Sequence, residues 1–101
     1  MIEVKRVGTP GSFEFEVTVR DADGETRHRV TIARETYDRL SGGKFNSEQC
    51  VEAAFAFLLE REPKESILRR FDLAVISRYF PEFEREFSGY LQQSARNDKR
   101  P

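Results

Sequence analysis

Hydrophobic and polar residues alternate one by one in two segments near the start of the chain. In each segment an apolar side chain occupies every second position, with glutamate, threonine or arginine between, if His28 is counted with the apolar residues. A period of two places such residues on one face of a strand. The pattern predicts two antiparallel strands, at about 13–21 and 26–33, and residues 2–7 are a candidate third strand.

The turn between the two strands sets their register. Asp23 and Gly24 both tolerate positive φ, so we expect a two-residue turn centred on them. This turn pairs Val17 with Val30, and apolar residues then meet along one face. A three-residue loop would place Val17 opposite Arg29 and mix the two faces, whereas a four-residue loop gives the same pairing as the two-residue turn.

A spacing of three and four residues takes over in the middle of the chain and predicts a central helix at about 47–61. Asn46 and Gln49 have the spacing of a reciprocal capping box at its start. Its apolar arc covers roughly 200°, about twice what a surface helix needs. We therefore expect other elements to cover this helix on two sides.

Three other segments have helical patterns. Gly42 and Gly43 end the first, and Pro81 interrupts the last, which implies a break or a kink there. The additional predicted helices lie at about 34–41, 66–71 and 73–91. With the hairpin they define an α+β fold, a single small globular domain over residues 1–91, followed by a disordered polar tail at 92–101.

Composition narrows the range of functions. Charged residues make up 35% of the chain but nearly cancel, giving a net charge of −1. Nucleic-acid binding usually requires a basic excess or patch, which the bulk charge does not supply. Cys50 is the only cysteine, so no internal disulfide forms, and neither a signal peptide nor a membrane span is visible. We expect a cytoplasmic protein without a membrane partner.

No catalytic constellation is found. His28 and Cys50 are single residues of their kinds, and we interpret both as structural. No metal-binding spacing, dinucleotide fingerprint or hydrolase motif occurs. The sequence therefore predicts no catalytic residue, metal ligand or cofactor, although a small enzyme of unknown type remains a third interpretation.

Residues 27–61, RHRVTIARETYDRLSGGKFNSEQCVEAAFAFLLER, resemble the ribbon–helix–helix family of DNA-binding proteins. A short strand, a helix, a glycine turn and a second helix that starts with Ser-Glu follow in the family's order. Members pair their strands in a dimer and lay this ribbon in the major groove. The resemblance implies that Arg27, Arg29 and Thr31 would contact bases and phosphates in such a dimer.

A second resemblance lies further along the chain. Residues 66–84, SILRRFDLAVISRYFPEFE, are similar to a segment of short bacterial proteins that are described only as hypothetical. This resemblance implies an autonomous bacterial domain and no particular activity.

The C-terminal segment is rich in aromatic residues, which would either complete the core or form an apolar patch. We therefore expect a non-enzymatic protein-binding or adaptor domain whose partner is another protein or a second copy, with the DNA-binding dimer as the alternative. The candidate partner patch consists of Tyr79, Phe83, Phe87 and Tyr90.

Overall fold

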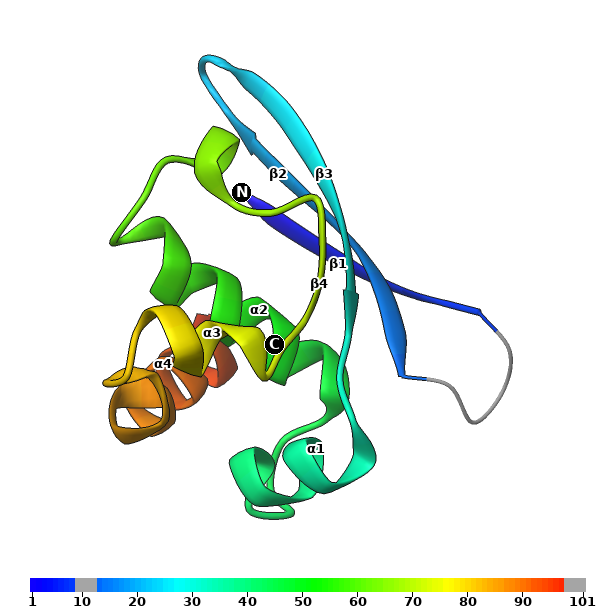
Figure 1. Cartoon of the computed structure of the whole chain (residues 1–101), viewed down its shortest axis with the longest axis vertical. Coiled ribbons are helices and arrows are strands. Elements are labelled where there is room, and N and C mark those ends of the chain that lie inside the picture. Colours follow the sequence, from blue (N-terminus) through cyan, green and yellow to red (C-terminus); the bar gives the residue numbers. More distant parts are fainter. Residues whose placement is uncertain (9–12, 98–101) are drawn as a thin grey trace.

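A computed structural model describes residues 1–8 and 13–97, with side chains described up to residue 94. The fold is α+β, as predicted: a four-stranded sheet in the order β1-β2-β3-β4, with the helices gathered on one side of it (Figure 1). Strands β1, β2 and β3 are antiparallel, and β4 runs parallel to β3. The elements are β1 (Ile2–Val7), β2 (Glu14–Asp21), β3 (Gly24–Thr31), α1 (Arg34–Ser41), α2 (Ser47–Leu59), the 3₁₀ turn η1 (Lys64–Ser66), β4 (Arg70–Asp72), α3 (Val75–Tyr79) and α4 (Phe83–Asn97).

The hairpin register differs by two residues from the predicted one. Val17 faces His28 rather than Val30, because the turn is centred on residues 22–23. Both turn residues keep negative φ, and Gly24 follows them with φ +131°. A turn followed by a glycine at positive φ is another common hairpin connection. The shift by two keeps every side chain on its predicted face, so alternation alone could not reveal it.

The predicted helix at 66–71 is wrong. Only η1 is helical in this region, and Arg70–Asp72 forms β4. Two backbone hydrogen bonds frame the pairing with β3: the Arg29 N–H donates to the Arg69 carbonyl at 2.7 Å, and the Leu73 N–H donates to the Thr31 carbonyl at 2.8 Å. These contacts join residues about forty positions apart, and they outweigh the weak local preference for a helix.

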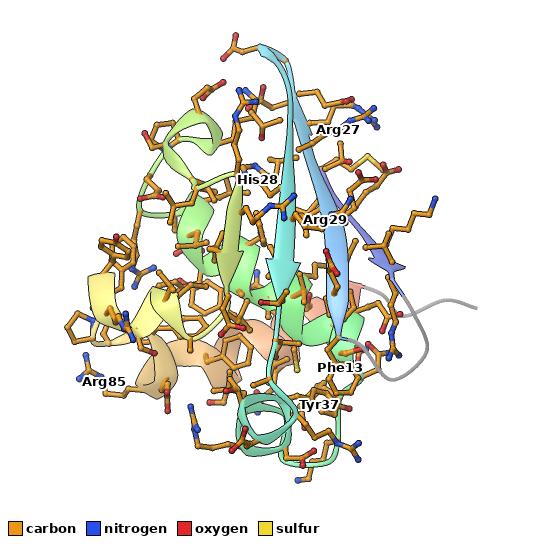
Figure 2. All side chains as sticks on the ribbon, turned by 45° about the vertical axis from the view of Figure 1, so that its right-hand side comes forward. Phe13, Arg27, His28, Arg29, Tyr37 and Arg85 are labelled. Atoms are coloured by element: carbon orange, nitrogen blue, oxygen red, sulfur yellow. The ribbon has the colours of Figure 1, made fainter. Side chains whose placement is uncertain are left out.

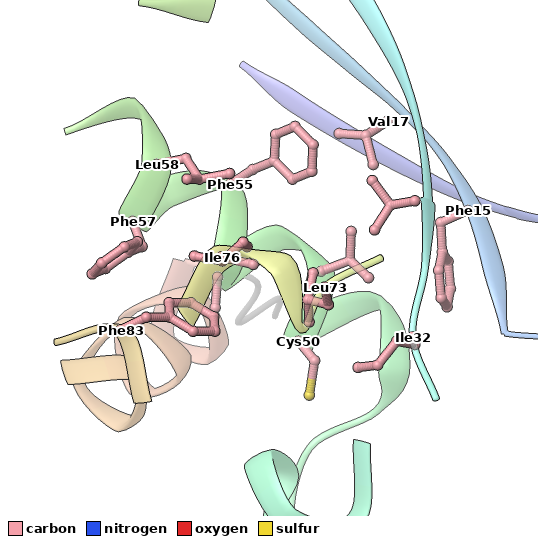
Figure 3. Close-up of a cluster of buried hydrophobic side chains, with 14 of the residues drawn as sticks. Phe15, Val17, Ile32, Cys50, Phe55, Phe57, Leu58, Leu73, Ile76 and Phe83 are labelled. Atoms are coloured by element: carbon pink, nitrogen blue, oxygen red, sulfur yellow. The ribbon is translucent and has the colours of Figure 1, made fainter. Parts of the chain in front are cut away.

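Helix α2 lies at the centre of the core. The predicted capping box is present: Asn46 Oδ1 accepts from the Gln49 N–H at 2.8 Å, and Gln49 Oε1 accepts from the Asn46 N–H at 2.9 Å. Figure 3 shows Phe55 pointing toward the strands and Phe57 pointing the other way, toward Phe83 on α4. Both are fully buried, so the helix is covered on two sides, as its wide apolar arc predicted.

The C-terminal helices pack against the far side of α2. The predicted break at Pro81 is confirmed, because α3 ends at Tyr79 and α4 begins at Phe83. The Arg61 guanidinium, 3.7 Å above the Phe57 ring, joins the end of α2 to the start of α4. It does so through ion pairs to Glu82 at 3.1 Å and Glu86 at 2.8 Å.

The end of the chain differs from the predicted polar tail. Helix α4 continues to Asn97, and Ser94 is buried, where its hydroxyl donates to Glu52 on α2 at 2.7 Å. A polar side chain is accommodated there because it has a hydrogen-bond partner. The rest of the predicted tail, residues 98–101, lies outside the described residues.

Candidate binding surface

An open groove of about 340 Å³ lies between the end of α2, the segment that leads into β4, and helix α3. Its floor consists of core side chains that are almost fully buried, Leu58, Ile67 and Ile76 among them. Its borders include Leu68 and Tyr79, which are 50% and 68% exposed. Large apolar side chains with this exposure next to a groove are typical of an interaction site.

Local sequence explains why Leu68 and Tyr79 are left outside. Ile67, which lies before β4, and Phe71, which lies within it, are both buried in the core. Leu68 lies between them in the chain, and its side chain is directed outward. The Leu68 carbonyl accepts a hydrogen bond from His28 Nδ1 at 2.8 Å, which fixes this segment against β3. Tyr79 is the last residue of α3, on the turn before the Pro81 break.

Two arginines flank these exposed residues in the chain. Arg69 follows Leu68 and Arg78 precedes Tyr79, and both side chains are exposed. Among the residues that the structure describes, neither arginine forms an ion pair. Glu62 is the acidic residue among those lining the groove. An apolar groove whose border residues are followed or preceded in the chain by unpaired cations is complementary to an apolar segment that carries acidic residues.

The structure divides the predicted partner patch. Tyr79 is exposed and Tyr90 is half-buried, whereas Phe83 and Phe87 are each 1% exposed. Phe83 packs edge-on against Phe57, with ring centroids 4.9 Å apart. The two phenylalanines thus complete the core and are not accessible to a partner, because they lie on the face of α4 that covers α2.

The three candidate DNA-binding residues lie together on the outer face of β3, where Figure 2 labels Arg27 and Arg29. Each is already engaged within the chain. Arg27 pairs with Glu25 at 3.1 Å, and Arg29 pairs with Glu14 at 2.9 Å. The Thr31 hydroxyl donates to Asp72 at 2.7 Å.

A ribbon–helix–helix dimer would also require an unpaired edge on this strand. β3 pairs with β2 along its whole length and with β4 from Arg29 to Thr31. The β3 strand is therefore internal to the sheet, and the structure does not favour a ribbon formed with a second copy at this position.

The single histidine and the single cysteine are both buried. His28 Nδ1 donates to the Leu68 carbonyl at 2.8 Å, and Nε2 lies 2.9 Å from the Thr26 hydroxyl, so both ring nitrogens have a hydrogen-bond partner. Burial raises the pKa of the Cys50 thiol to about 12, which disfavours the thiolate. Among the described residues, no group of three or more His, Cys, Asp and Glu side chains is placed to bind a metal ion.

A buried lysine holds the tip of the hairpin against η1. Lys64 Nζ lies 2.9 Å from Asp21 and 2.7 Å from Glu65. Hydrogen bonds from Lys64 hold the pKa values of both carboxyls below their usual range. A general acid needs a raised pKa to hold a proton near neutrality, so this cluster has the character of a structural contact.

Comparisons of this chain with protein-family models, with curated proteins and with solved structures gave no significant match. Within the described part of the chain, none of the helices has both the length and the apolar character needed to cross a membrane.

The groove was only partly visible in the sequence. The predicted patch includes Tyr79, but Leu68 falls in the helix predicted at 66–71, and its pattern gives no indication that the side chain is exposed. The signal that could have identified it is the pair of arginines after Leu68, since a charged pair is typical of a segment that emerges at the surface.

Proposed function

We propose that this protein is a non-enzymatic protein-binding domain that holds an apolar segment of a partner in the groove between α2, β4 and α3. The observation that carries the proposal is the position of Leu68 and Tyr79, two of the most exposed large apolar side chains, at the border of one groove. Such residues lose contact with water when a partner covers them, which favours binding.

The shape of the groove favours a peptide segment over a small molecule. Ligand pockets usually enclose most of a small molecule's surface. This groove is open along one side, so its contents would stay partly exposed. One or two side chains of a larger partner can fill it while the rest of the partner covers Leu68 and Tyr79.

The charged residues next to Leu68 and Tyr79 in the chain narrow the class of partner. Arg69 and Arg78 are exposed and form no ion pair within the described part of the chain. A partner segment with acidic residues next to its apolar anchors would give each arginine an opposite charge. The proposed ligand is therefore an acidic amphipathic peptide segment.

Selection from a displayed library of random peptides tests this function with the full chain. We expect enriched peptides that combine large apolar residues with aspartate or glutamate. Leu68→Ser and Tyr79→Ser should each weaken binding of a selected peptide at least about tenfold, as hot-spot residues do. Both side chains are largely exposed, so these changes should leave the fold intact.

Arg85→Ser is the control, because the Arg85 side chain is 77% exposed but does not line the groove. Peptide affinity should be unchanged in this variant. Failure to enrich any peptide, or selected peptides that bind the Leu68→Ser and Tyr79→Ser variants as tightly as the original chain, would refute the proposed function.

A further inference from the structure

Strand β1 has one unpaired edge. It is the first strand in the sheet order, so β2 pairs with one side of it and no described strand pairs with the other. An edge strand presents a row of unused N–H and C=O groups that can pair with another strand. The question is which strand fits this edge.

The ladder with β2 identifies which backbone groups of β1 point outward. Met1 and Arg20 exchange two hydrogen bonds, at 2.7 and 2.8 Å, so this rung is a hydrogen-bonded pair. Hydrogen-bonded and non-hydrogen-bonded pairs alternate along an antiparallel ladder. Glu3 and Lys5 therefore direct their backbone groups toward β2, whereas Val4 directs its N–H and C=O toward the open edge.

We propose that β1 pairs with β1 of a second copy of this chain, antiparallel, with the two Val4 residues facing each other on the two-fold axis. The Val4 N–H and C=O of each copy then exchange two hydrogen bonds with those of the other. The two sheets join edge to edge into one continuous sheet of eight strands, four from each copy. A symmetric contact of this kind is the commonest way in which identical chains associate.

The side chains on the outer face of β1 are self-complementary in this register. Glu3 of each copy faces Lys5 of the other, and Met1 faces Val7. Because the Glu3–Lys5 rung is a non-hydrogen-bonded pair, its side chains lie closer together than those of the neighbouring rungs. On this outer face two acid–base rungs and two apolar rungs result, and on the inner face Val4 faces Val4 while Ile2 faces Arg6.

The groups that would form these rungs are accessible. Lys5 is exposed and forms no ion pair with the described residues, and Glu3 pairs with Arg20 only at the long distance of 3.8 Å. Met1 is 73% exposed, the largest exposed fraction of any apolar side chain described. Pairing would cover it against an apolar neighbour.

Charge excludes the two neighbouring registers that keep the same hydrogen-bonding pattern. A register centred on Glu3 would place the two Glu3 carboxylates opposite each other. A register centred on Lys5 would place the two Lys5 ammonium groups opposite each other. Like charges directly opposite each other on adjacent strands are destabilising. The Val4-centred register is the one in which both charges meet their opposites.

Charge reversal tests the register. We expect sedimentation equilibrium of the full chain to show a monomer–dimer equilibrium, and Glu3→Lys or Lys5→Glu alone to weaken it about tenfold, because each turns two attractive rungs into two repulsive ones. The double variant E3K/K5E should recover the original association to within about threefold. Glu35→Lys makes the same charge change on α1, far from β1 in sequence, and should leave the dimer unchanged.

Crosslinking locates the two-fold axis independently. In a hydrogen-bonded pair the Cα atoms lie about 5.5 Å apart, a distance that suits a disulfide. With oxidised glutathione as the oxidant, Val4→Cys should form a covalent dimer, whereas Lys5→Cys should not, because each Lys5 faces Glu3 of the other copy. The native Cys50 is buried and should not react. A wild-type chain that stays monomeric at its highest soluble concentration, a double variant that fails to recover, or equal crosslinking of both cysteine variants would overturn the proposal.

Discussion

Replacing Phe57 with leucine should lower the free energy of unfolding more than the same replacement at Phe15. Both rings are fully buried, so both variants lose similar apolar volume from the same core. They differ in what surrounds the ring. Phe57 contacts three other aromatic rings, at centroid distances of 4.9, 5.5 and 5.8 Å, and lies 3.7 Å below the Arg61 guanidinium. Phe15 has no aromatic partner among the described residues.

The size of the difference follows from these contacts. Truncation of a buried phenylalanine to alanine costs about 3–5 kcal/mol, and leucine retains most of the side-chain volume, so we expect about 1–2 kcal/mol for Phe15→Leu. Each edge-on aromatic pair contributes about 0.5–1.5 kcal/mol beyond its buried area, and a cation over a ring contributes about 0.5–1 kcal/mol. Because such terms are not fully additive, we expect about 2–4 kcal/mol for Phe57→Leu.

The intrinsic helix and strand propensities of leucine and phenylalanine favour the opposite order of the two stability losses, which makes the comparison stringent. Leucine is a better helix former than phenylalanine in α2, and a poorer strand former in β2. Propensity alone would therefore make Phe15→Leu the more damaging change.

Urea unfolding followed by circular dichroism measures the comparison through the midpoint and slope of each transition. In a domain of this size, 1 kcal/mol corresponds to about 4–8 °C in the melting temperature, so thermal unfolding offers a second readout. Equal losses in the two variants, or a larger loss for Phe15→Leu, would show that the aromatic cluster around Phe57 adds nothing beyond its volume.

Two other expectations concern buried groups. Burial raises the Cys50 pKa to about 12, so a thiol reagent at neutral pH should label the folded protein only as fast as the structure around Cys50 opens. Urea should accelerate the reaction, and rapid labelling without urea would contradict the burial of Cys50. Lys64 lowers the pKa values of Asp21 and Glu65 below their usual 3.8 and 4.5. The stability from these contacts is present above those usual values and is lost as the pH falls through the lowered ones. Thermal unfolding between pH 5 and pH 2 should therefore show a steeper loss in the original protein than in Lys64→Met, and parallel curves would contradict this.

The groove illustrates how far sequence reasoning reaches for a binding site. Tyr79 is one of the four residues of the candidate partner patch, and the structure leaves it 68% exposed. Phe83 and Phe87 are four residues apart, a spacing that fits an exposed helix face as well as a buried one, yet both are buried. Periodicity shows that residues share a helix face, but it does not show what covers that face.

Local patterns were sufficient for much of the fold. The face of each residue in β2 and β3, the bounds of α1, the capping box of α2 and the break at Pro81 all depend on interactions within a few residues, which the sequence contains explicitly. These features were predicted because steric and hydrogen-bonding preferences act over one turn of helix or one rung of a hairpin.

Contacts between distant residues decided the rest. A hairpin shifted by two residues buries the same side chains, so only the geometry of the turn distinguishes the two registers. Residues 70–72 are too few to show a period, and they form a strand because β3 offers them a partner some forty residues earlier in the chain. When a segment is stabilised by pairing with a distant strand, its local sequence does not determine its secondary structure. The packed structure is then needed to reveal it.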